Sequence, residues 1–197
     1  MERTATYMTA FTLPNCLTYV RMTAVPAMAA CFFFLKGDLA HWLALSIFVI
    51  AAITDFFDGY FARAWKQQSS LGRMLDPIAD KLLVGVALLM LASVGIIGDW
   101  SLWAAIIILS REILVSGLRE YLAELSVSVP VTQLAKYKTT MQMLALGFLI
   151  AGPAGDKVFQ WTSTIGLTLL WGAAIITLYT GFDYFRAGLH HVFQDGS

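Results

Sequence analysis

Six stretches of mostly apolar residues follow one another along this chain, and each is close to the roughly 20 residues that a helix needs to cross a bilayer. A helix satisfies its own backbone hydrogen bonds, so it is the form in which such segments enter hydrocarbon. The expected spans are residues 13–35, 42–61, 75–97, 102–122, 140–154 and 161–184. The sequence therefore predicts an all-α, polytopic membrane protein with six transmembrane helices.

The composition supports this prediction. Of the 197 residues, 58% are hydrophobic and only 13% are charged, whereas soluble domains average roughly 45–50% and about 25%. Short connections with turn residues are expected at 36–38, 98–100 and 152–157. We expect a single membrane domain over residues 1–197, in which residues 1–12 form a short segment at the membrane surface.

The positive charges indicate an orientation. With six spans, one side of the membrane carries most of the lysines and arginines, while the other side has only Lys36 and Lys157. The positive-inside rule then places the first side, with both termini, in the cytoplasm.

Four aspartates interrupt the second and third spans on this side, namely Asp55, Asp58, Asp76 and Asp80. An aspartate at the centre of a membrane helix costs about 2.5–3.5 kcal/mol on insertion scales, so such residues usually have a function. The first two are three residues apart and the last two are four apart, so each pair shares a helix face. Because the two helices are antiparallel, both pairs are expected at one depth.

Converging carboxylates would repel one another unless a cation neutralised them. Oxygen-only ligands select hard cations such as Mg²⁺ or Mn²⁺. Four carboxylates can hold two such ions, an arrangement used in phosphoryl chemistry. Gly59, Ala62 and Gly72 leave room for a nucleotide to approach the backbone, and Arg63 offers a planar donor fork for a phosphate.

This pattern, Asp55-x2-Asp58-Gly59-x2-Ala62-Arg63-x8-Gly72-x3-Asp76-x3-Asp80, resembles the signature of the CDP-alcohol phosphatidyltransferase family without departure. The resemblance implies that the first three aspartates bind metal and that Asp80 binds metal and acts as general base. It also implies that Asp58, Gly59, Ala62, Arg63 and Gly72 hold the CDP part of CDP-diacylglycerol. A homodimer embedded in membrane lipid is implied too, and we expect no nucleic-acid partner.

Cations beyond the signature suggest an anionic acceptor. Arg111 and Arg119 are eight residues apart, close to two helical turns, and Lys138 opens the fifth span on the same side. Arginine forks match phosphate well. Glu112 and Glu120 offer an alternative, since they stand beside these arginines and can pair with them, and Arg119 and Lys138 can also be ordinary headgroup anchors.

Further segments resemble a bacterial branch of the family that uses sn-glycerol 3-phosphate. They are Leu13-Pro14-Asn15-x-Leu17-Thr18-x2-Arg21, Arg111-Glu112-Ile113 with Ser116-Gly117-Leu118-Arg119, and Lys136-x-Lys138-Thr139 with Gln142. The implied acceptor is glycerol 3-phosphate with Arg111, Arg119 and Lys138 as phosphate ligands, and the implied location is the bacterial cytoplasmic (inner) membrane. Asn15 is a further candidate contact to the nucleotide, although capping of the first helix explains it as well.

Other interpretations stay open at this point. Another family member would use inositol phosphate, serine or phosphatidylglycerol as acceptor, although serine has no need of a cation cluster. A divalent-cation carrier would explain the aspartates but not the glycine, alanine and arginine positions between them, and it would be expected to place its acids nearer the midplane. A purely structural membrane protein has no use for four costly carboxylates.

Overall fold

The computed structural model describes residues 13–65, 70–124 and 133–194. Helices are the regular secondary structure of this described part, and they follow one another as α2 (Leu13–Phe34), α3 (Asp38–Trp65), α4 (Ser70–Ser93), α5 (Ser101–Glu124), α6 (Gln133–Asp156) and α7 (Thr162–Gln194). The prediction of an all-α chain with six long helices is confirmed. The expected surface segment at residues 1–12 lies outside the described residues.

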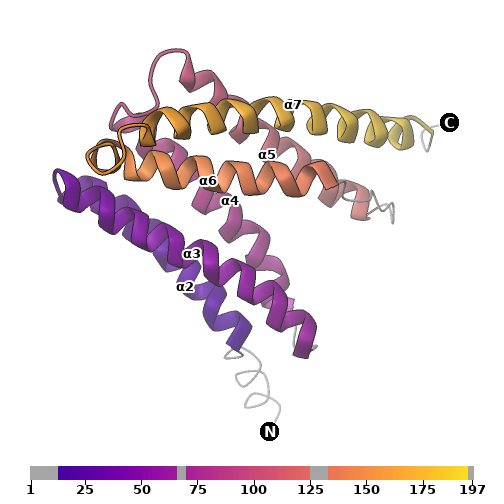
Figure 1. The fold of residues 1–197 in the computed structure, drawn as a ribbon. Coiled ribbons are helices and arrows are strands. Elements are labelled where there is room, and N and C mark those ends of the chain that lie inside the picture. The colour runs from indigo at the N-terminus through magenta and orange to yellow at the C-terminus, as the bar shows by residue number, and fades with distance from the viewer. Residues whose placement is uncertain (1–12, 66–69, 125–132, 195–197) are drawn as a thin grey trace, which may run out of the picture.

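The helices pack as antiparallel neighbours joined by short turns. Figure 1 shows α2 beside α3 and α6 beside α7, with α4 and α5 behind them. The turns that join α2 to α3, α4 to α5 and α6 to α7 gather at one end of the molecule. From that end the α2–α3 pair and the α6–α7 pair diverge, so the opposite ends of α3 and α6 stand farther apart (Figure 1).

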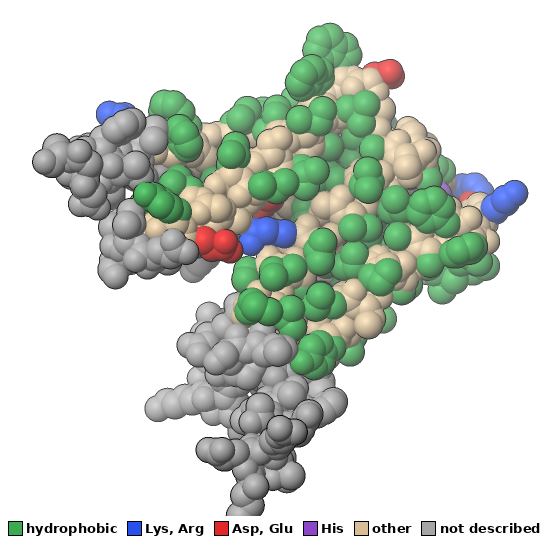
Figure 2. All heavy atoms as spheres, turned by 180° about the vertical axis from the view of Figure 1, so that it is seen from behind, with side chains coloured by type: hydrophobic (Ala, Val, Ile, Leu, Met, Phe, Trp, Pro, Cys, Tyr) green, Lys and Arg blue, Asp and Glu red, His purple; other side chains and the backbone are tan. Residues whose placement is uncertain are grey.

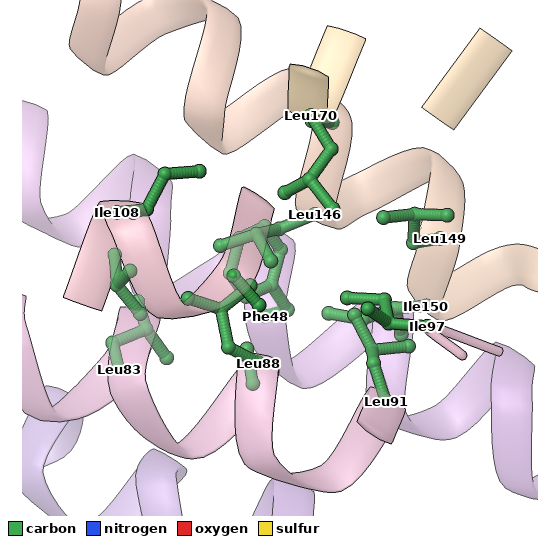
Figure 3. Packing of buried hydrophobic residues seen from close by; sticks show 14 of the residues in the cluster. Phe48, Leu83, Leu88, Leu91, Ile97, Ile108, Leu146, Leu149, Ile150 and Leu170 are labelled. Carbon is green, nitrogen blue, oxygen red and sulfur yellow. The ribbon is translucent and has the colours of Figure 1, made fainter. Parts of the chain in front are cut away.

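One apolar core holds all six of these helices together. Figure 3 shows Phe48 of α3, Leu88 of α4, Ile108 of α5 and Leu146 of α6 directed toward a common centre, and each is at most 2% exposed. Buried alanines from five of the helices belong to this core, namely Ala44, Ala87, Ala104, Ala145 and Ala173. Small residues at these points let helices pack closely, as is usual in membrane bundles.

The turn after α4 begins earlier than expected. The sequence predicts a third span that reaches residue 97, whereas α4 ends at Ser93. Gly95 has a φ of 74° and closes the helix through hydrogen bonds from its own N–H to Ala92 O (3.1 Å) and from Ile96 N–H to Leu91 O (3.0 Å). This is the Schellman arrangement that glycine favours after a helix. Ile97 still reaches the core, where it is fully buried.

The connection predicted at residues 152–157 begins where the helix breaks, and one further helical turn over residues 153–156 precedes the turn to α7. α6 continues to Asp156 and breaks its regular geometry only at Gly152, whose φ is 42° and ψ is −129°. Pro153 follows, and because proline lacks an N–H it tolerates this interruption. A side chain at Gly152 would meet Ile96 Cδ1 at 3.1 Å, so both the backbone angle and the packing require glycine here.

Contacts between helices secure this end of the molecule. Lys157 Nζ lies 2.6 Å from Asp38 Oδ1, which links the α6–α7 turn to the start of α3. His41 Nδ1 lies 2.8 Å from Ile150 O. The Asp156 carboxylate accepts hydrogen bonds from the hydroxyl and the backbone N–H of Ser163 and so caps α7.

Four helices contain a window long and apolar enough to cross a membrane: Leu17–Phe34, Asp38–Asp55, Ser101–Leu122 and Thr162–Phe182. The face seen in Figure 2 is covered largely by hydrophobic side chains, and charged side chains on it are few. α4 carries Asp76, Asp80 and Lys81 near its start. The chain is therefore a multi-pass membrane protein, and a spanning role for α4 and α6 stays a prediction.

Candidate active site

Asp55 near the end of α3 is held by an arginine from α2. Arg21 Nη1 lies 2.7 Å from Asp55 Oδ1. The Arg21 side chain is 1% exposed and that of Asp55 is 50% exposed. A buried guanidinium needs a counter-ion, and Asp55 supplies it. The Arg21 side chain is enclosed by the protein, whereas the Asp55 carboxylate stays accessible to a ligand.

Asp76 of α4 is held by the same face of α2. The Thr18 hydroxyl donates a hydrogen bond of 2.7 Å to Asp76 Oδ1. Thr18 and Arg21 are three residues apart, which places them on one side of a helix. α2 therefore orients one predicted metal ligand on each of the two helices that carry the aspartate pattern.

Asp80 lies one turn further along α4 and takes part in lining two different cavities. The first is an apolar groove between α3 and α6, with a volume of about 920 Å³, which Asp55 and Asp80 line at one end. The second is a small cavity of about 40 Å³ between α4, α5 and α6. Thr139 also lines both, so these two residues stand at the boundary between an apolar and a polar space.

The groove runs along most of the length of α3. Its lining begins at Asp55 and continues through Ala52, Val49 and Leu45 to Trp42. Asp55 and Trp42 are thirteen positions apart, which corresponds to roughly 20 Å along a helix. On α6 the facing residues include Gly147 and Ala151, whose small size leaves the groove open. A lipid acyl chain has the length and polarity that such a space accepts.

The small cavity is lined by Asp80, Glu112, Lys138, Thr139 and Gln142, among others. Lys138 is 4% exposed, and its ammonium group forms an ion pair with the Glu112 carboxylate. Glu112 also pairs with Arg111, as the sequence offers as an alternative, but this contact is longer: Arg111 Nη1 lies 3.8 Å from Glu112 Oε1. A buried lysine and a partly buried glutamate thus stand next to Asp80.

The two arginines predicted as phosphate ligands are in different settings. Arg111 packs across Gly181 of α7 and its Nη2 lies 3.4 Å from the hydroxyl of Thr180. Arg119 is exposed two turns further along α5 and is not among the residues that line the small cavity. The structure brings Lys138, rather than Arg119, beside Asp80.

Several predicted nucleotide contacts fall outside the described side chains. They are Asn15, Asp58, Gly59, Ala62 and Arg63, although the backbone of α3 is helical through Trp65. Gly72 is described and is buried within α4. The roles predicted for these residues stay predictions.

The donors at the site suit a hard divalent cation. Asp55, Asp76 and Asp80 offer only carboxylate oxygens, which Mg²⁺ and Mn²⁺ prefer, and the half-exposed Asp55 faces the groove. Among the side chains that the structure describes, no three acidic, histidine or cysteine residues form one cluster. Asp58, the fourth predicted ligand, lies outside that set.

Thr18 and Arg21 belong to the segment from Leu13 to Arg21 that resembles the bacterial branch of the family, but the sequence does not identify them as site residues. The available signal was an arginine inside an otherwise apolar span, because a charge there needs a partner. Which carboxylate it meets depends on how α2 packs against α3 and α4, and this packing is not written in the local sequence.

Comparison with known proteins agrees with the pattern of residues. The model of the family described as CDP-alcohol phosphatidyltransferase matches residues 11–179. A protein of Rickettsia bellii named CDP-diacylglycerol–glycerol-3-phosphate 3-phosphatidyltransferase is 47% identical over 175 residues, covering 89% of this chain and 94% of its own length. Proteins of the same name from Cereibacter sphaeroides and Sodalis glossinidius are 38% and 39% identical, and each alignment covers 92% of this chain and 97% of the relative.

Proposed function

The chain belongs to the CDP-alcohol phosphatidyltransferase family, and on this premise we propose that it transfers the phosphatidyl group of CDP-diacylglycerol to sn-glycerol 3-phosphate. The products are phosphatidylglycerol phosphate and CMP. The name shared by the relatives supports this reaction.

The observation that carries the proposal is the position of Asp80. This residue lines both the apolar groove and the small polar cavity. A phosphatidyltransferase must bring a lipid donor and a water-soluble acceptor to one point, and Asp80 stands where spaces suited to each of them meet. Lys138 and Glu112 give the acceptor side its charge.

The chemical step is an in-line displacement at the β-phosphorus of CDP-diacylglycerol. The primary hydroxyl oxygen of glycerol 3-phosphate forms a bond to this phosphorus, and the bond from phosphorus to the CMP oxygen breaks. The hydroxyl proton passes to a carboxylate oxygen of Asp80, which acts as general base. Lys138 holds the acceptor phosphate by charge, and Arg111 and Arg119 add positive potential on the same helix face.

Asp55, Asp58, Asp76 and Asp80 would hold two divalent cations, Mg²⁺ or Mn²⁺. When bound, these ions neutralise the pyrophosphate and the departing CMP. Thr18 and Arg21 keep Asp76 and Asp55 in place from the α2 side. Asn15, Gly59, Ala62, Arg63 and Gly72 are proposed to contact the CDP part.

We extend the proposal to the membrane arrangement. All six helices α2–α7 span the bilayer within a single domain, residues 1–12 lie at its surface, and the site faces the cytoplasm of a bacterial inner membrane. The excess of Lys and Arg on the site side supports this orientation. The groove between α3 and α6 receives an acyl chain of the donor, and the protein works as a homodimer.

The experiment is a measurement of CMP release by purified protein in micelles that contain CDP-diacylglycerol. Glycerol 3-phosphate, inositol phosphate, serine and phosphatidylglycerol are supplied one at a time, with Mg²⁺ and then with EDTA. We expect metal-dependent release with glycerol 3-phosphate alone. Release with another acceptor would overturn the acceptor assignment, and no release from folded protein with any acceptor would favour a cation carrier.

A variant tests the base assignment in the same assay. Asp80→Asn keeps the size of the side chain but cannot take up the proton, so turnover should fall to background while the protein elutes as a folded species. Turnover close to that of the wild type would rule Asp80 out as the general base.

A further inference from the structure

Gln142 is a buried polar residue that the proposed mechanism does not use. It is 3% exposed and lines the small cavity together with Asp80, Lys138 and Glu112. Within the described part of the chain, its Oε1 atom has no hydrogen-bond partner. Buried polar groups in native structures are nearly always paired, so the position calls for an explanation.

The cost of this arrangement argues against a role in packing. A buried amide oxygen without a partner costs roughly 1–3 kcal/mol, whereas a methionine or leucine would fill a similar volume without that cost. Gln142 lies four residues after Lys138, so the two side chains share one face of α6. A ligand that occupies the cavity can therefore contact both side chains together with Asp80.

The size of the cavity limits what this ligand can be. A volume of about 40 Å³ has room for a few groups the size of water. This suits part of a small polyol and is too small for a nucleotide or a lipid chain. The neighbouring residues divide the recognition, because a cation such as Lys138 suits a phosphate and a carboxylate such as Asp80 suits a hydroxyl that loses its proton. An amide carries one acceptor and two donors and is neutral, so it matches a hydroxyl that stays intact.

We propose that Gln142 determines acceptor specificity by hydrogen bonding to the secondary hydroxyl of glycerol 3-phosphate, which lies between the phosphate and the attacking primary hydroxyl. This inference rests on the proposed function. Sites built around a substrate hydroxyl reject analogues that lack it, because the buried polar group of the protein is then left unpaired. The amide thereby also fixes which end of the acceptor faces Asp80.

The test compares two acceptors that differ only in this hydroxyl, glycerol 3-phosphate and 3-hydroxypropyl phosphate. For the wild type we expect kcat/KM to be at least tenfold lower with 3-hydroxypropyl phosphate. Gln142→Met should lower kcat/KM for glycerol 3-phosphate by at least tenfold and change that for 3-hydroxypropyl phosphate by less than threefold. The KM for CDP-diacylglycerol should stay within twofold. Gln160→Met, at an exposed glutamine of the α6–α7 turn, is the matched control and should behave as the wild type does.

The outcomes separate this inference from the proposed function. A wild type that releases no CMP with glycerol 3-phosphate contradicts the function itself. A wild type that uses both acceptors equally well overturns the role of Gln142 without any variant. Equal losses with both acceptors in Gln142→Met would mean that the amide holds only a water or the local structure. If Gln142→Met does not fold, Gln142→Asn replaces it, and its loss should again be confined to glycerol 3-phosphate.

Discussion

Arg21 of α2 and Asp55 of α3 form an ion pair in which Nη1 lies 2.7 Å from Oδ1, with the arginine buried and the aspartate half-exposed. Arg21 is almost completely buried. Its partner Asp55 is one of the aspartates that the family pattern implies as metal ligands. Arg21 thus balances charge from the protein side, while Asp55 stays open on the groove side. Removal of Arg21 should therefore show how much Asp55 depends on this counter-charge.

We expect Arg21→Met to lower the apparent melting temperature, and to lower it more in EDTA than in millimolar Mg²⁺. The loss of the partner leaves the Asp55 carboxylate without its counter-charge, and a divalent cation can replace that charge. Because Asp55 is half-exposed, water screens part of the effect. Arg21→Lys keeps the charge and should show a smaller deficit. An equal deficit with and without Mg²⁺ would contradict this account of the pair.

Thr18→Val removes the hydroxyl that orients Asp76 and keeps the shape of the side chain. Net hydrogen bonds are worth about 0.5–1.5 kcal/mol, so kcat should fall by roughly 2- to 10-fold. The Mg²⁺ concentration for half-maximal activity should rise as well. Thr23→Val on the same helix is the control, because the hydroxyl of Thr23 is exposed and bonds only to Val20 O in the contacts described.

Lys138→Met should raise the KM for glycerol 3-phosphate by about tenfold or more, with the KM for CDP-diacylglycerol within twofold. Arg119→Met should have a smaller effect, since Arg119 is exposed while Lys138 lines the cavity. The double variant Lys138→Met with Glu112→Gln removes both charges of the pair, and it should fold while the KM stays high. A larger effect at Arg119 would place the acceptor phosphate outside the small cavity.

Gly147→Leu should narrow the groove where α6 faces α3. A Cβ atom at this position meets only Leu45 Cδ1, at 4.0 Å, so the variant can fold, but the added branch occupies space lined by Val49 and Phe48. The leucine takes space from a bound acyl chain, so we expect the KM for CDP-diacylglycerol to rise by about tenfold. The KM for glycerol 3-phosphate should not change. Ala27→Leu, on the exposed side of α2, adds the same side chain elsewhere, and equal effects of the two variants would argue against an acyl groove.

Asp156 gives a prediction about pH. Hydrogen bonds from the Ser163 hydroxyl and then from its backbone N–H lower the pKa of this carboxyl below its ordinary value. A lowered folded-state pKa means that the stabilisation is complete above about pH 5 and is lost as the pH falls through the folded value. The difference in apparent melting temperature between the wild type and Asp156→Asn should therefore be constant from pH 7 to about pH 5 and shrink below that. A difference that grows on acidification would contradict the capping role.

The amino-acid sequence by itself determined the helices and the aspartate pattern. Both are local properties, because an apolar stretch of about 20 residues prefers a helix in lipid and spacings of three or four fix which residues share its face. The local sequence defines the ends of the helices less closely than their interiors. The sequence predicts a connection from Gly152 onward, and the helix does break at Gly152, but one more helical turn follows before the chain reaches Asp156. Ile96 and His41 leave little room for a side chain at this break.

Only the tertiary structure decided the partners of these residues. Thr18 meets Asp76 across 58 positions of sequence, Lys138 meets Glu112 across 26, and Gln142 enters the cavity of Asp80. Helical periodicity says which way a side chain points, but it does not say which helix lies opposite. That choice depends on the burial of apolar surface by all the helices together, and so Lys138 stands beside Asp80 while Arg119, with an equally suitable side chain, lies at the surface.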